Sequence, residues 1–200
     1  SSSISTTSII NTFPAPSNPT ITQLAVNSVK IDWTDNSTGE DGFKIDKKND
    51  TGIWTVGYAS VGSNVITWTD TAAAISDSLQ YRVYGYKGTA YSTYAYTSTS
   101  DLTFPPPSNI TYSSVSVSSI KLDWTDNSTG ETGFKIDKSV DGGAWTIAYG
   151  TVAGDVVTWT DSNAPINQNI QYRVYGYTAT DESSYATTPV ITNTFPVPAF

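Results

Sequence analysis

The segment "DWTDNSTGETGFKIDK", residues 123–138, decides how this chain is interpreted, because nearly the same letters, "DWTDNSTGEDGFKIDK", stand at residues 32–47. Each segment places Trp and Phe on either side of a run rich in Asp, Asn, Ser, Thr and Gly. Apolar residues that alternate with polar ones predict β-strands, and the residue types between them are those that form turns. We therefore expect a strand, a turn and a second strand, present twice in one chain.

The two segments belong to a longer repeat. Trp33 recurs as Trp124 and Tyr81 as Tyr172, and both pairs are 91 residues apart (124 − 33 and 172 − 81). Roughly half of the aligned positions are identical, and no insertion or deletion interrupts the register. Such self-similarity predicts two copies of one domain, residues 13–103 and residues 104–194.

The ends of the chain continue the same pattern. "SSISTTSIINT" at residues 2–12 aligns with residues 184–194, where the second copy ends, and "FPVPAF" at residues 195–200 resembles the opening of a copy. We expect residues 1–12 to be a last-strand-like segment of a preceding repeat, and residues 195–200 to be the start of the next repeat or a linker. The chain would then be a piece of a longer array. The alternative is a natural N-terminal extension that only resembles a last strand.

Each copy predicts seven β-strands, and no window shows a helical period. "GFKIDK" places Phe43 and Ile45 on the inner face of a strand and Lys44 and Asp46 on its outer face. Seven short strands in about 90 residues predict an all-β fold, with a two-sheet Greek-key sandwich in each copy. The expected strands of the first copy are residues 17–26, 28–34, 42–48, 53–59, 64–70, 79–87 and 91–101, and the second copy repeats them 91 residues later.

The composition narrows the classes of function. The formal net charge of −8 and the pI near 4.2 argue against nucleic acids and anionic membrane surfaces as partners, since both need a basic face. No apolar run approaches the roughly 18 residues of a membrane span, so we expect no membrane insertion in this segment. The chain contains no Cys, His or Met. This removes disulfides, thiolate nucleophiles, Cys/His metal sites and the Ser-His-Asp triad, and we expect neither enzymatic activity nor a cofactor.

Three motifs resemble those of the fibronectin type III family, which has a Trp on the second strand, [Tyr/Phe]-x-[Ile/Val] on the third and Tyr-x-Val-x-[Ala/Gly] on the sixth. The first copy has Trp33, Phe43-Lys44-Ile45 and Tyr81-Arg82-Val83-Tyr84-Gly85, and the second has Trp124, Phe134-Lys135-Ile136 and Tyr172-Arg173-Val174-Tyr175-Gly176. "WTDNSTGETGF" looks like the prokaryotic secreted or cell-surface versions of this module. The resemblance covers nearly the whole chain and implies two tandem immunoglobulin-like (fibronectin type III) seven-stranded β-sandwiches.

The resemblance also implies a tyrosine corner in each copy. In the family the hydroxyl of the sixth-strand Tyr, here Tyr81 or Tyr172, bonds the backbone just upstream. A hydrophobic residue usually stands six positions earlier, here Ile75 or Ile166. Neither loop between the sixth and seventh strands, "YKGTAYS" or "YTATDESS", contains Arg-Gly-Asp, so integrin-type adhesion is not implied.

The acidic turn between the second and third strands is a candidate for metal binding. It offers oxygen ligands of the kind that Ca²⁺ prefers, but their spacing does not match an EF-hand loop. Turn chemistry accounts for the same residues, because Asp, Asn and Ser side chains bond nearby backbone N–H groups and Gly39 and Gly42 take positive φ. We therefore expect no metal site. The residues weighed are Asp32, Asp35, Asn36, Glu40 and Asp41.

Four Asn-x-Ser/Thr triplets are candidate N-glycosylation sites on expected loops. Such triplets also arise by chance in a chain rich in Ser, Thr and Asn, and their use depends on the host. The four asparagines are Asn36, Asn127, Asn49 and Asn109.

Tyrosines on the outer face of the sixth strand are candidates for contact with another subunit or with a glycan. Tyr84 and Tyr86 alternate with the inward residues of the first copy, and Tyr175 and Tyr177 do so in the second. Aromatic strips on a sheet can stack sugar rings or pack against a second protein. The alternative is ordinary cross-strand pairing with neighbouring side chains, which stabilises a sheet by roughly 0.2–1 kcal/mol per pair.

These observations favour a non-catalytic extracellular structural repeat, a spacer, stalk or filament-forming module on a microbial surface. Its expected partners are neighbouring repeats or copies of itself, and surface glycans. The alternative is a pair of accessory or carbohydrate- or adhesion-binding modules in a larger secreted enzyme or adhesin. A third and weaker alternative, an enzyme in its own right, conflicts with the lack of His and Cys.

Overall fold

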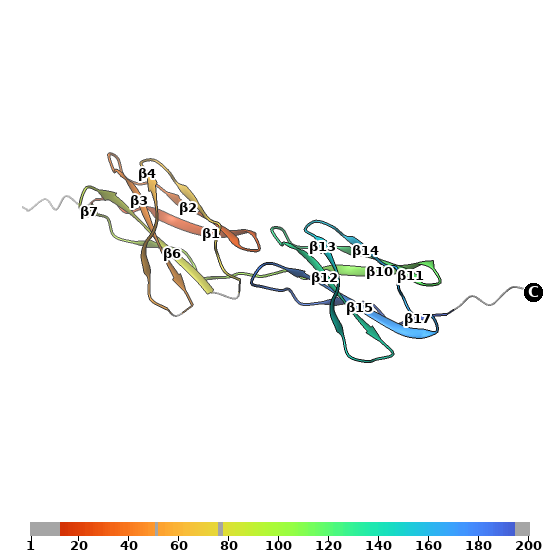
Figure 1. Cartoon of the computed structure of the whole chain (residues 1–200). Helices are drawn as coiled ribbons and strands as arrows, with labels where there is room; N and C mark the ends of the chain where they lie inside the picture. Colours follow the sequence, from red (N-terminus) through yellow and green to blue (C-terminus); the bar gives the residue numbers. More distant parts are fainter. Residues whose placement is uncertain (1–12, 51, 76–77, 195–200) are drawn as a thin grey trace, which may run out of the picture. The chain divides into compact units, whose positions relative to one another are not determined.

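The computed structural model describes residues 13–50, 52–75 and 78–194, and no helix occurs among them. The expectations for residues 1–12 and 195–200 lie outside the described residues. The chain divides into two compact units; apart from residues 25–27, which group with the second unit, the boundary lies between Leu102 and Thr103. Both units consist of β-strands joined by turns (Figure 1).

The first unit is a sandwich of two sheets. One sheet has the strand order β1-β2-β5, and the other has the order β4-β3-β6-β7, with β8 and β9 also paired to β6. Every strand pair whose register is resolved is antiparallel. The strands are β1 (Ser17–Ala25), β2 (Ser28–Thr34), β3 (Gly42–Asn49), β4 (Thr55–Gly62), β5 (Thr67–Asp70), β6 (Ser78–Lys87), β7 (Ala90–Tyr91), β8 (Ala95–Tyr96) and β9 (Ser100–Asp101).

The second unit repeats this arrangement. Its sheets have the orders β10-β11-β14 and β13-β12-β15-β16, with β17 also paired to β15. In Figure 1, β12 and β15 lie side by side at the centre of the larger sheet, as their pairing requires. The strands are β10 (Ser108–Ser116), β11 (Ser119–Thr125), β12 (Gly133–Val140), β13 (Thr146–Ala153), β14 (Thr158–Asp161), β15 (Gln168–Tyr177), β16 (Ala186–Thr187) and β17 (Ile191–Asn193).

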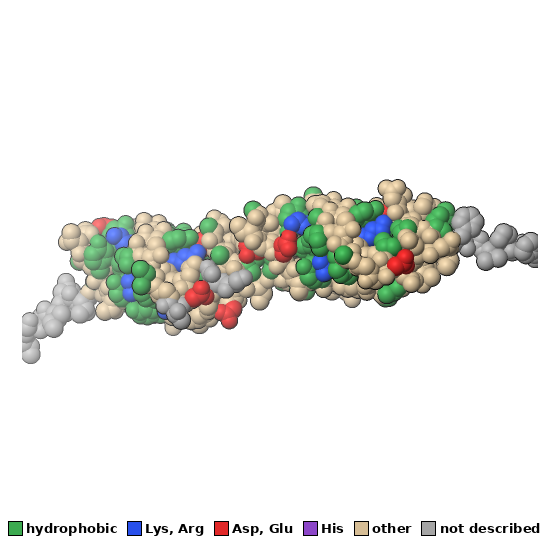
Figure 2. Space-filling model, turned by 60° about the horizontal axis from the view of Figure 1, so that its bottom comes forward, with side chains coloured by type: hydrophobic (Ala, Val, Ile, Leu, Met, Phe, Trp, Pro, Cys, Tyr) green, Lys and Arg blue, Asp and Glu red, His purple; other side chains and the backbone are tan. Residues whose placement is uncertain are grey.

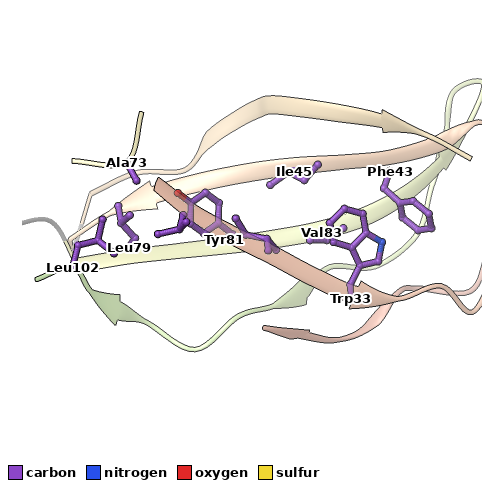
Figure 3. Close-up of a cluster of buried hydrophobic side chains, with 10 residues drawn as sticks. Trp33, Phe43, Ile45, Ala73, Leu79, Tyr81, Val83 and Leu102 are labelled. Atoms are coloured by element: carbon purple, nitrogen blue, oxygen red, sulfur yellow. The ribbon is translucent and has the colours of Figure 1, made fainter. Parts of the chain in front are cut away.

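The core of the first unit lies between its two sheets and confirms the predicted alternation. Trp33, Phe43 and Ile45 point into it and are at most 4% exposed (Figure 3). The Trp33 ring meets the Phe43 ring edge-on, with the centroids 5.6 Å apart. Nε1 of Trp33 is buried with no hydrogen-bond acceptor among the described residues, and Figure 3 shows this nitrogen on the side of the indole that faces Phe43.

The last strand differs from the prediction. A continuous strand over residues 91–101 was expected, but three short pieces, β7, β8 and β9, pair in turn with β6, and the register shifts from one piece to the next. At each shift a hydroxyl replaces a backbone group of the ladder. The Ser92 Oγ accepts from the Gly85 N–H at 2.9 Å, and the Thr97 Oγ1 accepts from the Tyr81 N–H at 3.0 Å. The alternation of residues cannot reveal these interruptions, because Ser and Thr also occur in regular strands.

The bounds of β4 and β5 also differ from the prediction. β4 runs over Thr55–Gly62 rather than residues 53–59, and β5 begins at Thr67 rather than at residue 64. Asn64 has a φ of 60°, in the left-handed region that turn residues adopt, so the chain is still turning where a strand was expected. Asparagine tolerates this conformation better than other non-glycine residues.

Candidate interaction surface

A buried ion pair lies inside each sandwich. Lys47 follows Phe43 and Ile45 on the inner face of β3, and its Nζ lies 2.8 Å from Oδ2 of Asp70 on β5. The two side chains are 8% and 2% exposed. The second unit repeats the pair as Lys138 and Asp161, with a separation of 2.6 Å. Because both charges are removed from water, the pair has to be completed by further hydrogen bonds.

Tyrosine hydroxyls and a backbone N–H complete the pair. The Tyr81 hydroxyl donates to Oδ2 of Asp70 at 2.7 Å, the Tyr58 hydroxyl donates to Oδ1 at 3.2 Å, and the Ala72 N–H donates to Oδ1 at 2.9 Å. Burial alone would raise the pKa of Asp70, but the hydrogen bonds from Lys47, Tyr81 and the Ala72 N–H outweigh it and hold that pKa below its usual value. The Asp70 carboxylate therefore stays ionised, and both of its oxygens accept hydrogen bonds. This suits a structural ion pair rather than a general base near pH 7.

These contacts correct the expected tyrosine corner. Tyr81 and Tyr172 bond carboxylates, Asp70 and Asp161, rather than the backbone just upstream. The expected hydrophobic residue six positions earlier is also not the buried one. Ile75 is only partly buried and Ile166 is exposed, whereas Ala73 and Ala164 are buried in the cores.

A second buried cluster lies on the outer face of the larger sheet. Asp46 points to the outer face, as alternation predicts, but its side chain is fully buried. Nε of Arg82 lies 2.7 Å from its Oδ2, and the Gly57 N–H donates to its Oδ1 at 2.7 Å. The second unit repeats these contacts as Asp137, Arg173 and Ala148.

Aromatic rings cover this outer cluster. The Arg82 guanidinium carbon lies 4.6 Å from the centroid of Trp54 and 3.8 Å from that of Tyr94. The guanidinium thus lies within cation–π distance of two rings, an interaction that arginine favours. Arg173 lies against Trp145 and Tyr185 in the same way, at 4.5 and 4.1 Å.

Two of the four tyrosines predicted to contact a partner are inaccessible. Tyr84 is 5% and Tyr175 is 1% exposed. Tyr94 packs on the Tyr84 ring with centroids 5.0 Å apart, and Tyr185 packs on Tyr175 at 4.9 Å. Burial and the neighbouring Asp46 carboxylate, which accepts a bond from the Tyr84 hydroxyl, raise the pKa of Tyr84 to about 12. Tyr84 and Tyr175 therefore belong to the buried cluster.

The other two predicted tyrosines remain partly accessible. Tyr86 and Tyr177 are half-buried, and a lysine lies over each ring, Lys44 at 5.3 Å from the Tyr86 centroid and Lys135 at 4.8 Å from that of Tyr177. The most exposed rings on this face of the first unit are instead Tyr91, Tyr94 and Tyr96, at 51%, 44% and 49%. The sequence pattern alone cannot rank the exposure of these rings, because exposure depends on which ring packs on which.

The acidic turn is organised by its own side chains. The Ser37 N–H donates to Asp35, and the Ser37 hydroxyl lies 3.0 Å from a carboxylate oxygen of both Asp35 and Glu40 and can donate to either. Glu40 in turn accepts from the Asn64 N–H at 3.1 Å, which ties this turn to the turn that follows β4. Gly39 and Gly42 have φ of 80° and 155°, as turn chemistry predicts.

The five weighed metal ligands do not converge in the first unit. Asp32 pairs with Lys30 at 2.8 Å, and Asp41 accepts from the Gly88 N–H at 2.7 Å. In the second unit, three carboxylates do have oxygens within 4.8 Å of one another, those of Asp126, Glu131 and Asp155. Asp155 lies outside the acidic turn, on a separate hairpin, so the sequence motif did not include Asp155. The first copy has Asn64 at the equivalent position and therefore lacks the third carboxylate. Hydrogen bonds to Ser128 and to the Asp155 N–H already occupy this cluster.

All four sequon asparagines are exposed. Nδ2 of Asn36 donates to the Ala15 carbonyl at 2.8 Å, and Nδ2 of Asn127 donates to the Pro106 carbonyl at 2.7 Å. Nδ2 of Asn109 donates to a threonine hydroxyl on β11 at 3.3 Å. Asn36 and Asn127 therefore hold the proline-rich opening of their own unit against the turn after the second strand.

Comparison with known proteins gives structural neighbours only. No family model and no curated protein sequence matches the chain. A two fibronectin type III domain segment from chicken tenascin is 12% identical, with a TM-score of 0.48, and covers 90% of this chain and 99% of its own. The FN1–FN3 domains of chicken CNTN1 are 16% identical, with a TM-score of 0.43, and cover 92% of this chain and 68% of their own.

The strand order defines the class of each unit. The short pieces after β6, and those after β15, together form one interrupted seventh strand in each unit. Each unit then has a sheet of its first, second and fifth strands facing a sheet of its fourth, third, sixth and seventh strands. The described residues therefore form two tandem, all-β, immunoglobulin-like sandwiches of the fibronectin type III kind, which confirms the predicted fold class. No helix among the described residues is long and apolar enough to cross a lipid bilayer. On the face drawn in Figure 2, backbone and uncharged polar side chains cover most of the surface, and charged side chains are sparse.

Proposed function

We propose that the chain is a non-catalytic extracellular structural repeat, a spacer, stalk or filament-forming module on a microbial surface. The observation that carries the proposal is that the same two buried ion pairs occur in both copies. The inner pair Lys47–Asp70 and the outer pair Arg82–Asp46 recur as Lys138–Asp161 and Arg173–Asp137, with nearly the same distances. The shared polar groups thus hold each sandwich together, and their carboxylates are engaged within their own unit.

The two repeats are residues 13–103 and residues 104–194 in this proposal. Each range carries its own core cluster, one built around Trp33 and Phe43 and the other around Trp124 and Phe134. A domain of about 90 residues can bury enough apolar surface to fold without disulfides, and the chain has none to form. Each range, expressed alone, should unfold in a single cooperative transition. A range that is unfolded alone but folded in the full chain would contradict these boundaries.

The extracellular location is supported by the surface chemistry. Charged residues make up only 14% of the chain, and Ser, Thr, Asn and Tyr supply much of its polarity. Glycans at Asn36, Asn127, Asn49 or Asn109 would fit such a location, since all four are exposed. Mass spectrometry of material from the native source would detect them.

Assembly is the property that tests the proposal. A chain in which residues 13–194 are duplicated should double the number of folded units and lengthen the particle in small-angle scattering, as a spacer requires. Negative-stain microscopy and sedimentation at several concentrations test the filament version. Monomers at all concentrations would exclude self-assembly, and a duplicated chain that collapses to the size of one copy would exclude the spacer.

The alternative is a pair of accessory modules that bind carbohydrate or mediate adhesion in a larger secreted protein. The exposed tyrosines of the first unit favour it, since neighbouring aromatic side chains at a surface are typical of interaction sites.

A further inference from the structure

Four aromatic side chains lie on the outer face of the first unit and are linked to one another directly or through the buried Tyr84. They are Trp54, Tyr91, Tyr94 and Tyr96, here called the aromatic strip. Tyr96 meets Trp54 with ring centroids 5.8 Å apart, and it meets Tyr94 at 6.2 Å. Tyr94 and Tyr91 both pack on the buried Tyr84, at 5.0 and 5.8 Å. The ring contacts therefore run from Tyr91 on β7, through Tyr84 on β6, to Tyr96 on β8 and to Trp54, the residue before β4.

The strip is held rigid from below. Arg82 lies between Trp54 and Tyr94 and is fixed by Asp46, which is itself fully buried. The Tyr84 hydroxyl also reaches Asp46, at 3.3 Å. Because these rings are already ordered, a ligand that stacks on them loses little side-chain entropy on binding.

Two lysines give the strip a positive charge. Nζ of Lys44 lies 5.0 Å from the Tyr91 centroid and 3.4 Å from its hydroxyl, and Nζ of Lys48 lies 5.2 Å from the Trp54 centroid. Within residues 13–50, 52–75 and 78–194, neither lysine forms an ion pair. Arg82 is neutralised by Asp46. The face thus has two uncompensated cations in a chain whose net charge is −8.

The second unit keeps the scaffold but loses the strip. Positions equivalent to Lys48, Tyr91 and Tyr96, counted 91 residues later, hold Ser139, Glu182 and Thr187. Glu182 lies 2.7 Å from Lys135, the equivalent of Lys44, and neutralises it. The strip and its charge are therefore not needed for this fold, because the second unit folds the same way without them.

We propose that the aromatic strip binds an acidic polysaccharide, whose sugar rings stack on the exposed tyrosines while Lys44 and Lys48 pair with its carboxylate or sulfate groups. Rings that present both an apolar face and a hydroxyl suit sugars, which also combine apolar faces with hydroxyls. The unpaired lysines select an anionic chain over a neutral one. This binding is separate from the spacer role, and either can fail without the other.

Isothermal titration with sodium polygalacturonate and with dextran sulfate, against neutral dextran, tests the proposal in the full chain. We expect binding of at least one acidic polymer with one site per chain, and weaker binding as salt is added, because salt screens exposed charges. Neutral dextran should bind at least about tenfold more weakly. Equal binding of neutral and acidic polymers, or no binding of either acidic polymer, would overturn the proposal.

The second copy supplies the matched variants. Lys48→Ser, Tyr91→Glu and Tyr96→Thr together place its residues in the first unit. Affinity should fall at least about tenfold, because two rings and the Lys48 cation are lost and the new glutamate neutralises Lys44 as Glu182 neutralises Lys135. The reverse set, Ser139→Lys, Glu182→Tyr and Thr187→Tyr, should create a second site and double the stoichiometry. Circular dichroism and thermal unfolding confirm that both variants fold. If the first set abolishes self-association seen by sedimentation but leaves polysaccharide binding unchanged, the strip is an interface between copies and the proposal is wrong.

Discussion

The Tyr81 hydroxyl and the Lys47 ammonium meet at one oxygen, Oδ2 of Asp70, at 2.7 and 2.8 Å. The three residues come from β6, β3 and β5, so the contact joins the two sheets of the sandwich. The same arrangement in the second unit joins Tyr172, Lys138 and Asp161. Each ion pair thus acts as a cross-link through an otherwise apolar core.

Lys47→Met should destabilise the first unit strongly. The change leaves Asp70 buried without its counter-charge, and breaking a buried pair typically costs about 3–5 kcal/mol. We expect about 3 kcal/mol, because the hydroxyl and backbone donors to Asp70 remain. Calorimetry of the full chain should show one of its transitions shifted down. Lys30→Met is the control, since the Lys30–Asp32 pair is exposed and should contribute below about 1 kcal/mol; equal effects of the two changes would contradict the role of the buried pair.

Stability should fall in acid. The pKa values of Asp70 and Asp161 are lowered in the folded state, where hydrogen bonds from lysine and tyrosine outweigh the burial that would raise them. In the unfolded chain an Asp titrates near about 3.9, so the unfolded state binds protons first as the pH drops. The stabilisation is complete above that value and is lost as the pH falls through the folded pKa values. Urea unfolding between about pH 6 and pH 2 should show this decline, which Asp161→Asn should reduce for the second unit.

Stability should also fall in alkali. Burial first, and neighbouring carboxylates second, raise the pKa values of Tyr81, Tyr84, Tyr172 and Tyr175. Because an unfolded Tyr ionises near about 10, the free energy of unfolding should decrease as the pH rises above that value. These four rings should contribute tyrosinate absorbance only well above about pH 10 or on unfolding. A single stage near pH 10 for all tyrosines, with the fold intact, would contradict their burial.

Ala148→Gly should stabilise the second unit. Ala148 has a φ of 50° because its N–H turns to donate to Asp137 at 2.7 Å, and a left-handed conformation is costly for a residue with a Cβ. The first unit has Gly57 there, with a φ of 67°. We expect a gain of about 0.5–1 kcal/mol in the free energy of unfolding, and a loss of similar size for Gly57→Ala. Chemical denaturation of both variants measures this, and effects of the same sign would refute the explanation.

Thr188→Val should weaken the interrupted last strand of the second unit. The Thr188 Oγ1 accepts from the Tyr172 N–H at 3.0 Å in a buried position, and valine would leave that N–H unpaired. An unsatisfied buried donor costs about 1–3 kcal/mol. Thr187→Val is the neighbouring control at an exposed position and should change stability by less than about 0.5 kcal/mol. Amide hydrogen exchange of Tyr172 should quicken only in the first variant.

Local pattern was sufficient for the fold class and for most of the core. Alternation placed Trp33, Phe43 and Ile45 inside, and turn residues separated the strands in the order that a sandwich needs. The bonds that interrupt the last strand were not predictable, because Ser92 and Thr97 bond residues of β6 that the alternation does not relate to them.

The candidate surface depended far more on tertiary structure. Alternation correctly put Asp46 and Tyr84 on the outer face, yet both are buried, because Arg82 and Tyr94 lie over them. Exposure is set by side chains from other strands, and no period along one strand contains that information.

The sequence by itself determined the doubled sandwich, since the 91-residue repeat and the two-residue alternation can both be read along the chain without knowledge of tertiary contacts. Only the tertiary structure decided which charges are buried and which rings face solvent. Lys47 and Asp70 are 23 residues apart, and Trp54 and Tyr96 are 42 apart (96 − 54), and each pair meets only when separate strands pack together. A charged side chain can be buried only if a partner lies within hydrogen-bonding distance. In these pairs the partner is distant in the sequence, so only the folded structure reveals it.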